Sequence, residues 1–149
     1  MIDFNIGTEL VDIQLRKRKK FDLIYRAGKG GSVTTPALLY GKKIVFAAMD
    51  SNIYCIDLRG NELWRLRIQE PVFESMSLFK DMLIFGSYDS HVYCYDIENV
   101  TEIWRFKTND KIACSPPCVY KDIILIGSGD GNLYCINSCL LYTSPSPRD

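Results

Sequence analysis

The chain has 149 residues, of which 47% are hydrophobic and 24% are charged, as is typical of a globular protein. Acidic and basic residues number 18 each, so no overall field attracts nucleic acid, and no nucleic-acid partner is expected. No apolar run approaches the roughly 20 residues of a membrane-spanning helix, so no transmembrane segment is expected.

The first residues lack the pattern of a secretory signal. Residues 1–15 include Asp3, Glu9 and Asp12 and show no basic start followed by an apolar block. We therefore expect a cytoplasmic protein by default, and a periplasmic one if the true N-terminus lies upstream of Met1.

Residues 1–29 form the first predicted segment. Residues 10–15 and 21–25 alternate as strands do, on either side of the basic run Arg-Lys-Arg-Lys-Lys at 16–20. Two interpretations stay open: an N-terminal hairpin, and a partial or degenerate copy of the unit that repeats downstream. The basic run is expected to be a solvated tip, because no aromatic side chains for base stacking interrupt it.

From residue 30 onward the sequence repeats about every 40 residues. Three features recur in register. They are a turn aspartate (Asp50, Asp89, Asp130), a Tyr-Cys pair (Tyr54-Cys55, Tyr93-Cys94, Tyr134-Cys135) and an aromatic-Arg pair (Tyr25-Arg26, Trp64-Arg65, Trp104-Arg105). We therefore divide this part into units of about residues 30–69, 70–109 and 110–138, the last of which is incomplete.

Each unit is expected to hold about four short strands and no helix. In the first unit the apolar run 44–48 fits a strand buried on both faces, and Asp50 begins a tight turn to a strand at 53–56. Residues 63–66 and 35–40 supply the other two strands. One four-stranded antiparallel sheet per 40 residues is typical of a propeller blade, so we predict an all-β chain of about three blades in an incomplete ring.

Residues 139–149 break the pattern. The third unit stops before its expected Trp, and the string from Cys139 to Asp149 resembles a translation of sequencing-adapter DNA. We expect these residues to be a non-native tail, with a natural Ser/Pro-rich tail as the alternative. The codons of the gene across this stretch distinguish the two.

The units resemble the pyrroloquinoline-quinone-like propeller repeat. Blades of that family carry a tryptophan-docking motif, roughly Ala-x-Asp-x-x-Thr-Gly-Lys-x-x-Trp. Residues 94–104 have its full length, with Asn-Val-Thr in place of Thr-Gly-Lys, and residues 55–64 are one residue shorter. The resemblance implies that neighbouring blades dock through five residues: Tyr25, Trp64, Trp104, Asp57 and Asp96.

The repeat also bears on chemistry. Cys55, Cys94 and Cys135 recur once per unit, as apolar fillers would, whereas a metal site gathers its ligands at one place. The recurring turn aspartates are expected to bond to backbone amides of their own turns. We see no nucleophile–base pair and no ligand constellation, so we assign no catalytic, cofactor-binding or metal-binding residue.

These observations favour a non-catalytic propeller module that binds a protein or small ligand across one face. The resemblance leaves two alternatives open: a fragment of a quinone-dependent dehydrogenase, and a propeller accessory to another enzyme. Only the dehydrogenase would bring cofactors, pyrroloquinoline quinone and calcium. The adjacent-cysteine pair that many such enzymes carry does not occur in this sequence.

Overall fold

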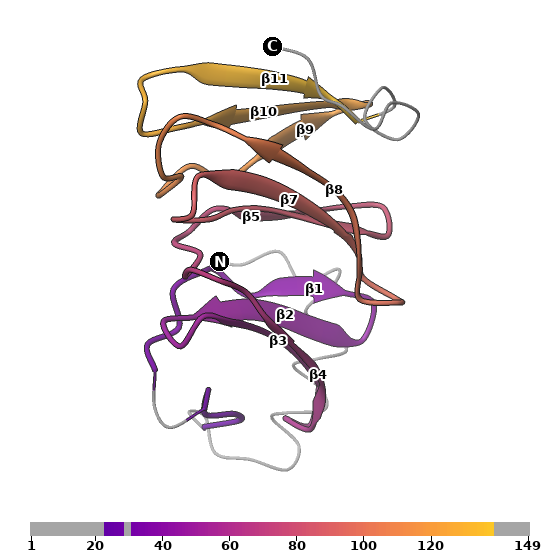
Figure 1. Ribbon diagram of the computed structural model, residues 1–149. Helices are drawn as coiled ribbons and strands as arrows, with labels where there is room; N and C mark the ends of the chain where they lie inside the picture. Colours follow the sequence, from indigo (N-terminus) through magenta and orange to yellow (C-terminus); the bar gives the residue numbers. More distant parts are fainter. Residues whose placement is uncertain (1–22, 29–30, 139–149) are drawn as a thin grey trace, which may run out of the picture.

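The computed structural model describes residues 23–28 and 31–138, and within them the chain is all-β (Figure 1). This confirms the predicted fold class. The strands are β1 (Leu38–Tyr40), β2 (Lys43–Ala48), β3 (Asn52–Asp57), β4 (Glu62–Arg67), β5 (Met76–Phe79), β6 (Met82–Gly86), β7 (His91–Asp96), β8 (Thr101–Lys107), β9 (Cys118–Tyr120), β10 (Ile123–Gly127) and β11 (Leu133–Asn137). The expected N-terminal hairpin at 10–25 and its basic run fall largely outside the described residues, as does the tail at 139–149.

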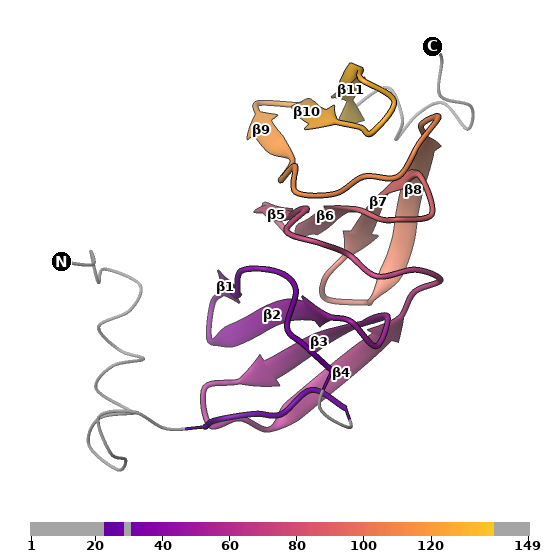
Figure 2. The ribbon, with the colours of Figure 1, turned by 90° about the vertical axis from the view of Figure 1, so that its left-hand side faces the viewer.

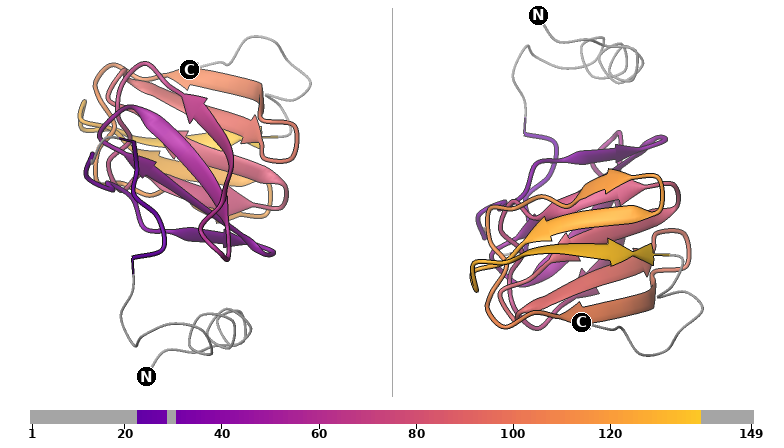
Figure 3. Two further views of the ribbon diagram at one scale, coloured as in Figure 1. Left: turned by 90° about the horizontal axis from the view of Figure 1, so that it is seen from below. Right: turned by 90° about the horizontal axis from the view of Figure 1, so that it is seen from above.

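The strands form three antiparallel sheets, each a simple meander. Their orders are β1-β2-β3-β4, β5-β6-β7-β8 and β11-β10-β9. The sheets are stacked one above another, and in the side view β1, β5 and β9 lie along one side of the stack with β4 and β8 along the other (Figure 2). Seen along the stack, the three sheets lie over one another (Figure 3). This is the arrangement of consecutive blades in a propeller that is not closed.

The second sheet is buried on both faces because its side chains alternate between two apolar clusters. Leu83 and Phe85 of β6 face the first sheet, where they pack with residues such as Val45. Ile84, between them, faces the third sheet and packs with residues such as Ile124. A continuous apolar run in the sequence therefore marks a strand that contacts both neighbouring sheets.

The first strand of the first sheet is shorter than the sequence predicts. The expectation was residues 35–40, whereas β1 begins at Leu38. The hydroxyl of Thr35 accepts the backbone N–H of Ala47 at 2.8 Å, and Thr34 donates from its hydroxyl to the carbonyl of Val72 at 2.6 Å. Side chains thus take the place of ladder hydrogen bonds, and regular pairing starts only after Pro36.

The tight turns between the second and third strands need a left-handed residue. Ser51 has φ 61°, Ser90 has φ 72° and Gly131 has φ 84° at equivalent positions. Only glycine adopts this conformation without steric cost, so the first two turns are held there by the bonds of the aspartate that precedes each serine. No helix in the described residues is long and apolar enough to cross a membrane.

Candidate functional site

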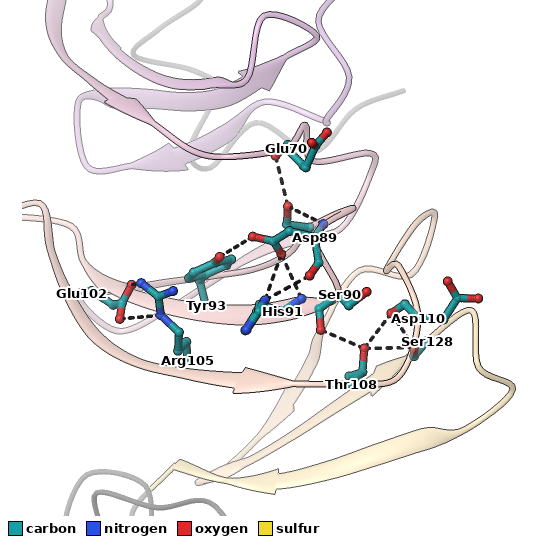
Figure 4. A network of polar contacts seen from close by, with 11 residues as sticks. Glu70, Asp89, Ser90, His91, Tyr93, Glu102, Arg105, Thr108, Asp110 and Ser128 are labelled. Carbon is teal, nitrogen blue, oxygen red and sulfur yellow. Dashed lines mark hydrogen bonds and ion pairs between the residues drawn. The ribbon is translucent and has the colours of Figure 1, made fainter.

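Each turn aspartate bonds within its own turn and to a tyrosine of the following strand. Asp89 accepts the backbone N–H of His91 at 2.9 Å and the hydroxyl of Tyr93 (Figure 4). Asp130 accepts the N–H of Asn132 at 2.9 Å and the hydroxyl of Tyr134 at 2.7 Å. The expected turn aspartates thus lie at one end of their sheets, which we call the loop face.

An Arg-Glu pair of the fourth strand continues this network. The guanidinium carbon of Arg105 lies 5.1 Å from the centre of the Tyr93 ring, and its nitrogens donate to Glu102 at 2.7 and 3.0 Å. Arg65 and Glu62 repeat the arrangement in the first sheet, at 5.0 Å from the Tyr54 ring and 2.8 Å between the charged atoms. Arg65 and Arg105 therefore pair with acids of their own strands.

The hydrogen bonds of this network fix the charge state of its groups. The bond from Tyr134 holds the pKa of Asp130 below its ordinary value. Burial works against ionisation of Asp50, but bonds from Tyr54 and Asn52 outweigh it, so its pKa is also lowered. Burial and the Asp89 carboxylate raise the pKa of Tyr93. The same bonds favour the neutral phenols, because the pKa values of Tyr54 and Tyr134 are also raised.

Asp57 and Asp96 lie at the opposite end of the third strands. Asp57 accepts backbone N–H groups of Arg59 at 2.8 Å and Asn61 at 2.9 Å. Asp96 accepts the N–H groups of Glu98 at 2.9 Å and of Asn99 at 3.2 Å. Both aspartates hold the turn into the fourth strand, and the structure does not bring them near the turn aspartates of the loop face.

The two tryptophans lie between sheets. Trp104 is 6% exposed in the cluster that joins the second and third sheets, and the half-buried Trp64 packs against the cluster that joins the first and second. Neither indole N–H has a hydrogen-bond partner in the described residues. Tyr25 packs on the first sheet, with ring centres 5.9 Å from Phe46 and 5.7 Å from Tyr54.

Hydroxyl side chains link the loops of consecutive sheets on the loop face (Figure 4). Thr108 donates to the carbonyls of Ser90 at 3.0 Å and Asp110 at 2.7 Å. Ser128 donates to the same Asp110 carbonyl at 3.1 Å, and Ser87 to that of Glu70 at 3.1 Å. These bonds fix the loops relative to one another, so the loop face is a preformed surface.

An aromatic and cationic cluster on the loop face departs from the repeat. The ring centres of Phe73 and Tyr88 are 4.5 Å apart, and the Lys111 ammonium lies 5.2 Å from the centre of the Tyr88 ring. Neither aromatic residue recurs in the other two units. Val33 and Ala113 take the position of Phe73, and Met49 and Gly129 take that of Tyr88. We call Phe73, Tyr88 and Lys111 the loop-face cluster.

The sequence interpretation missed this cluster. It was based on residues that recur in every unit. The sequence feature that marks this cluster is instead a departure from the repeat, two bulky aromatic residues at positions where the other units have small or aliphatic ones. Such a departure identifies a surface that packing of the repeat does not explain.

Among residues 23–28 and 31–138, no three His, Cys, Asp or Glu side chains gather to hold a metal ion. Each recurring aspartate is bonded within its own turn. Cys55 and Cys94 are buried, and burial raises the pKa of Cys94 to about 12, whereas Cys114, Cys118 and Cys135 are exposed free thiols.

Two solved structures share this fold at low sequence identity. BamB from Moraxella catarrhalis superposes with a TM-score of 0.64 and 17% identity, over 77% of this chain and 36% of that one. The quinohemoprotein alcohol dehydrogenase ADHIIG from Pseudomonas putida HK5 superposes with a TM-score of 0.68 and 16% identity, over 78% of this chain and 21% of that one. The chain thus spans about a third and a fifth of these proteins.

Sequence comparison extends the similarity over most of the chain. No curated protein matches. A family model described as outer membrane protein assembly factor BamB matches residues 7–138. Because that match covers well over half of the sequence, the chain belongs to this family of pyrroloquinoline-quinone-like propeller repeats.

Proposed function

We propose that the chain is a non-catalytic propeller module that binds a partner protein through its loop face. The loop-face cluster is the observation that carries this proposal. The recurring polar groups of the sheets are engaged in holding turns and strands, whereas Phe73, Tyr88 and Lys111 have no counterparts in the other units. Aromatic side chains on a rigid surface are typical anchors for protein binding.

The chemistry of the cluster indicates the kind of partner. Phe73 and Tyr88 are half-buried and offer an apolar surface, and the exposed Lys111 adds a positive charge beside it. An extended segment with an apolar side chain next to an acidic one would satisfy both. The family description, an assembly factor, supports a protein partner over a small ligand.

A peptide library displayed on phage and selected on the immobilised chain tests this proposal. We expect enrichment of segments that combine apolar and acidic residues, with at least tenfold weaker binding to Tyr88→Ser and to Lys111→Glu. Lys42→Glu, at the opposite end of the sheets, is the matched charge control and should bind normally. Circular dichroism establishes that each variant is folded. Absence of enrichment, or equal binding to all variants, would contradict the proposal.

The dehydrogenase alternative has its own test. Pyrroloquinoline quinone with calcium chloride is titrated into the chain while tryptophan fluorescence and quinone absorbance are followed. We expect no saturable change, because the recurring aspartates are bonded within their own turns. A saturable change that requires calcium would favour the alternative and overturn the non-catalytic interpretation.

A further inference from the structure

Met49 occupies on the first sheet the place that Tyr88 occupies on the second. Each residue follows the second strand of its sheet and directly precedes the turn aspartate. Val45 and Ala47 pack in the cluster between the first and second sheets, so the alternation of the strand points Met49 toward the second sheet. Met49 is nevertheless 48% exposed, on the side where the neighbouring sheet is described. An apolar side chain is therefore offered on the loop face of the first sheet as well.

Pro71 extends this apolar surface toward the loop-face cluster. Its carbonyl accepts the N–H of Tyr88 at 3.2 Å, as the carbonyl of Lys111 accepts the N–H of Gly129 at 2.9 Å. Pro71 and Lys111 are therefore equivalent in the repeat. Lys111 lies against a residue of the sheet before it, so the repeat places the half-buried Pro71 against Met49. We call four residues the loop-face strip: Met49, Pro71, Phe73 and Tyr88.

The two ends of the loop-face strip differ in charge. The exposed Glu70 precedes Pro71 at the first end, whereas the Lys111 ammonium lies 5.2 Å from the centre of the Tyr88 ring at the second. Asp110 precedes Lys111, but its carboxylate accepts the backbone N–H of Lys111 at 2.7 Å and so bends back onto its own loop. An acidic group of a partner is therefore attracted at the second end and repelled at the first.

The distance between sheets determines which conformation of a bound segment can contact both ends of the loop-face strip. Stacked sheets lie about 10 Å apart. Side chains on one face of a β-strand are about 6.6 Å apart at two residues and about 13 Å apart at four, and neither distance matches. A polyproline II helix has three residues per turn and a rise of about 3.1 Å per residue, so side chains on one face are about 9 Å apart. The strip therefore fits a polyproline II helix, a conformation that aromatic surfaces bind well.

We propose that the partner segment binds the loop-face strip as a polyproline II helix, with proline or another apolar residue at positions i and i+3 and an acidic residue one or two positions beyond. This inference rests on the proposed function, in which the loop face binds a partner protein. The residue at i packs on Met49 and Pro71. The residue at i+3 packs on Phe73 and Tyr88, which brings the acidic side chain within reach of Lys111. Proline suits both positions because it preorganises this helix and so lowers the entropy lost on binding.

Fluorescein-labelled synthetic peptides test the spacing, with binding to the full 149-residue chain followed by fluorescence anisotropy. Three peptides of equal composition carry two prolines at i and i+2, at i and i+3, or at i and i+4, with an aspartate directly after the second proline. Each peptide is also made in reverse order, so that both directions along the strip are sampled. We expect the better i, i+3 peptide to bind at least fivefold more tightly than either other spacing. Equal binding at all three spacings, or tighter binding at i+2 or i+4, would overturn the inference.

Variants of the chain separate this inference from the proposed function. Met49→Ser should weaken the i, i+3 peptide at least fivefold, whereas Leu63→Ser, at a 47% exposed residue at the opposite end of the sheets, should not. Glu70→Gln should strengthen binding of a peptide with aspartates at both ends, because it removes the repulsion at the first end. If Tyr88→Ser weakens every peptide but Met49→Ser and Glu70→Gln change nothing, the loop face binds its partner without this helix and the inference is wrong. If no peptide binds in a way that depends on Tyr88, the proposed function is wrong as well.

Discussion

Tyr134 donates a 2.7 Å hydrogen bond to Asp130, and the same Tyr–Asp bond joins Tyr93 to Asp89 one sheet earlier. In the earlier sheet, Arg105 also covers the tyrosine ring. Within the described residues no fourth strand follows β11, and the bond between Tyr134 and Asp130 is present nevertheless. The Asp–Tyr bond therefore forms within a single hairpin, and the fourth strand adds to a turn that is already fixed.

Tyr93→Phe tests how much this bond contributes. The substitution removes the donor to Asp89, whose side chain is only 9% exposed, and leaves a carboxylate oxygen with one fewer partner. We expect the free energy of unfolding to fall by about 1–3 kcal/mol. Urea denaturation followed by circular dichroism measures it. Tyr120→Phe, at a 66% exposed tyrosine, is the control, and an equal effect of both changes would contradict the prediction.

Acid should destabilise the chain through its turn carboxylates. Hydrogen bonds to Asn61 hold the pKa of Asp57 below its ordinary value, and those to Asn99 do so for Asp96. A folded pKa below the unfolded value of about 4 stabilises the chain above that value. This stabilisation is lost as pH falls through the folded pKa.

The measurement is the melting temperature between pH 6 and pH 2. We expect a decline that begins below about pH 4 and is less steep in Asp57→Asn and in Asp96→Asn. The control is Asp122→Asn, because Asp122 is an exposed turn residue outside these networks. If the three variants decline as steeply as the parent chain, these carboxylates are not the cause.

Gly86→Ala should loosen the contact between the second and third sheets. A Cβ at residue 86 would lie 2.3 Å from the Ile112 side chain and 2.7 Å from the Ser75 hydroxyl, so a buried neighbour must move. Overpacking of this kind costs about 1–3 kcal/mol. Gly127→Ala is the matched control, because its Cβ would meet only the Ser115 side chain, with the hydroxyl nearest at 3.0 Å. Thermal melts that rank the two variants in the reverse order would contradict the steric argument.

The docking role of Trp104 stays a prediction that substitution can test. Trp104→Ala would leave a large cavity between sheets, and we expect a loss of about 3–5 kcal/mol. Trp104→Phe should cost much less, because the indole N–H has no partner in the described residues and the ring still fills most of the space. Trp64→Ala should cost less than Trp104→Ala, because Trp64 is only half-buried. Chemical denaturation of the three variants measures these differences.

The sequence predicted the sheets well because the stacking of similar sheets explains both the repeat and the burial of the strands. Runs such as Leu83, Ile84 and Phe85 are apolar throughout because each sheet contacts two neighbours, and no alternation was needed to recognise them. The turn aspartates could also be recognised, because Asp followed by Ser or Gly is typical of a tight turn between two strands. The boundary of β1 was missed because the Thr35 hydroxyl replaces a backbone partner, which no pattern of hydrophobicity records.

The sequence shows Phe73 and Tyr88 as departures from the repeat, but it does not show that they meet. Phe73, Tyr88 and Lys111 lie in three separate loops, and only the stacking of the sheets brings them together. The pairing of Arg65 with Glu62 was half visible, since both recur with the repeat. That Arg65 pairs with this acid of its own strand is seen only in the structure.

The meander topology has a consequence for synthesis of the chain on the ribosome. Each strand pairs only with its neighbours in sequence, so β5 to β8 can complete their sheet before β9 has been translated. The sheets are then synthesised in the order in which they stack, and each completed sheet presents an apolar face on which the next can pack. The nascent chain can therefore bury its apolar residues progressively, without waiting for a distant segment to arrive.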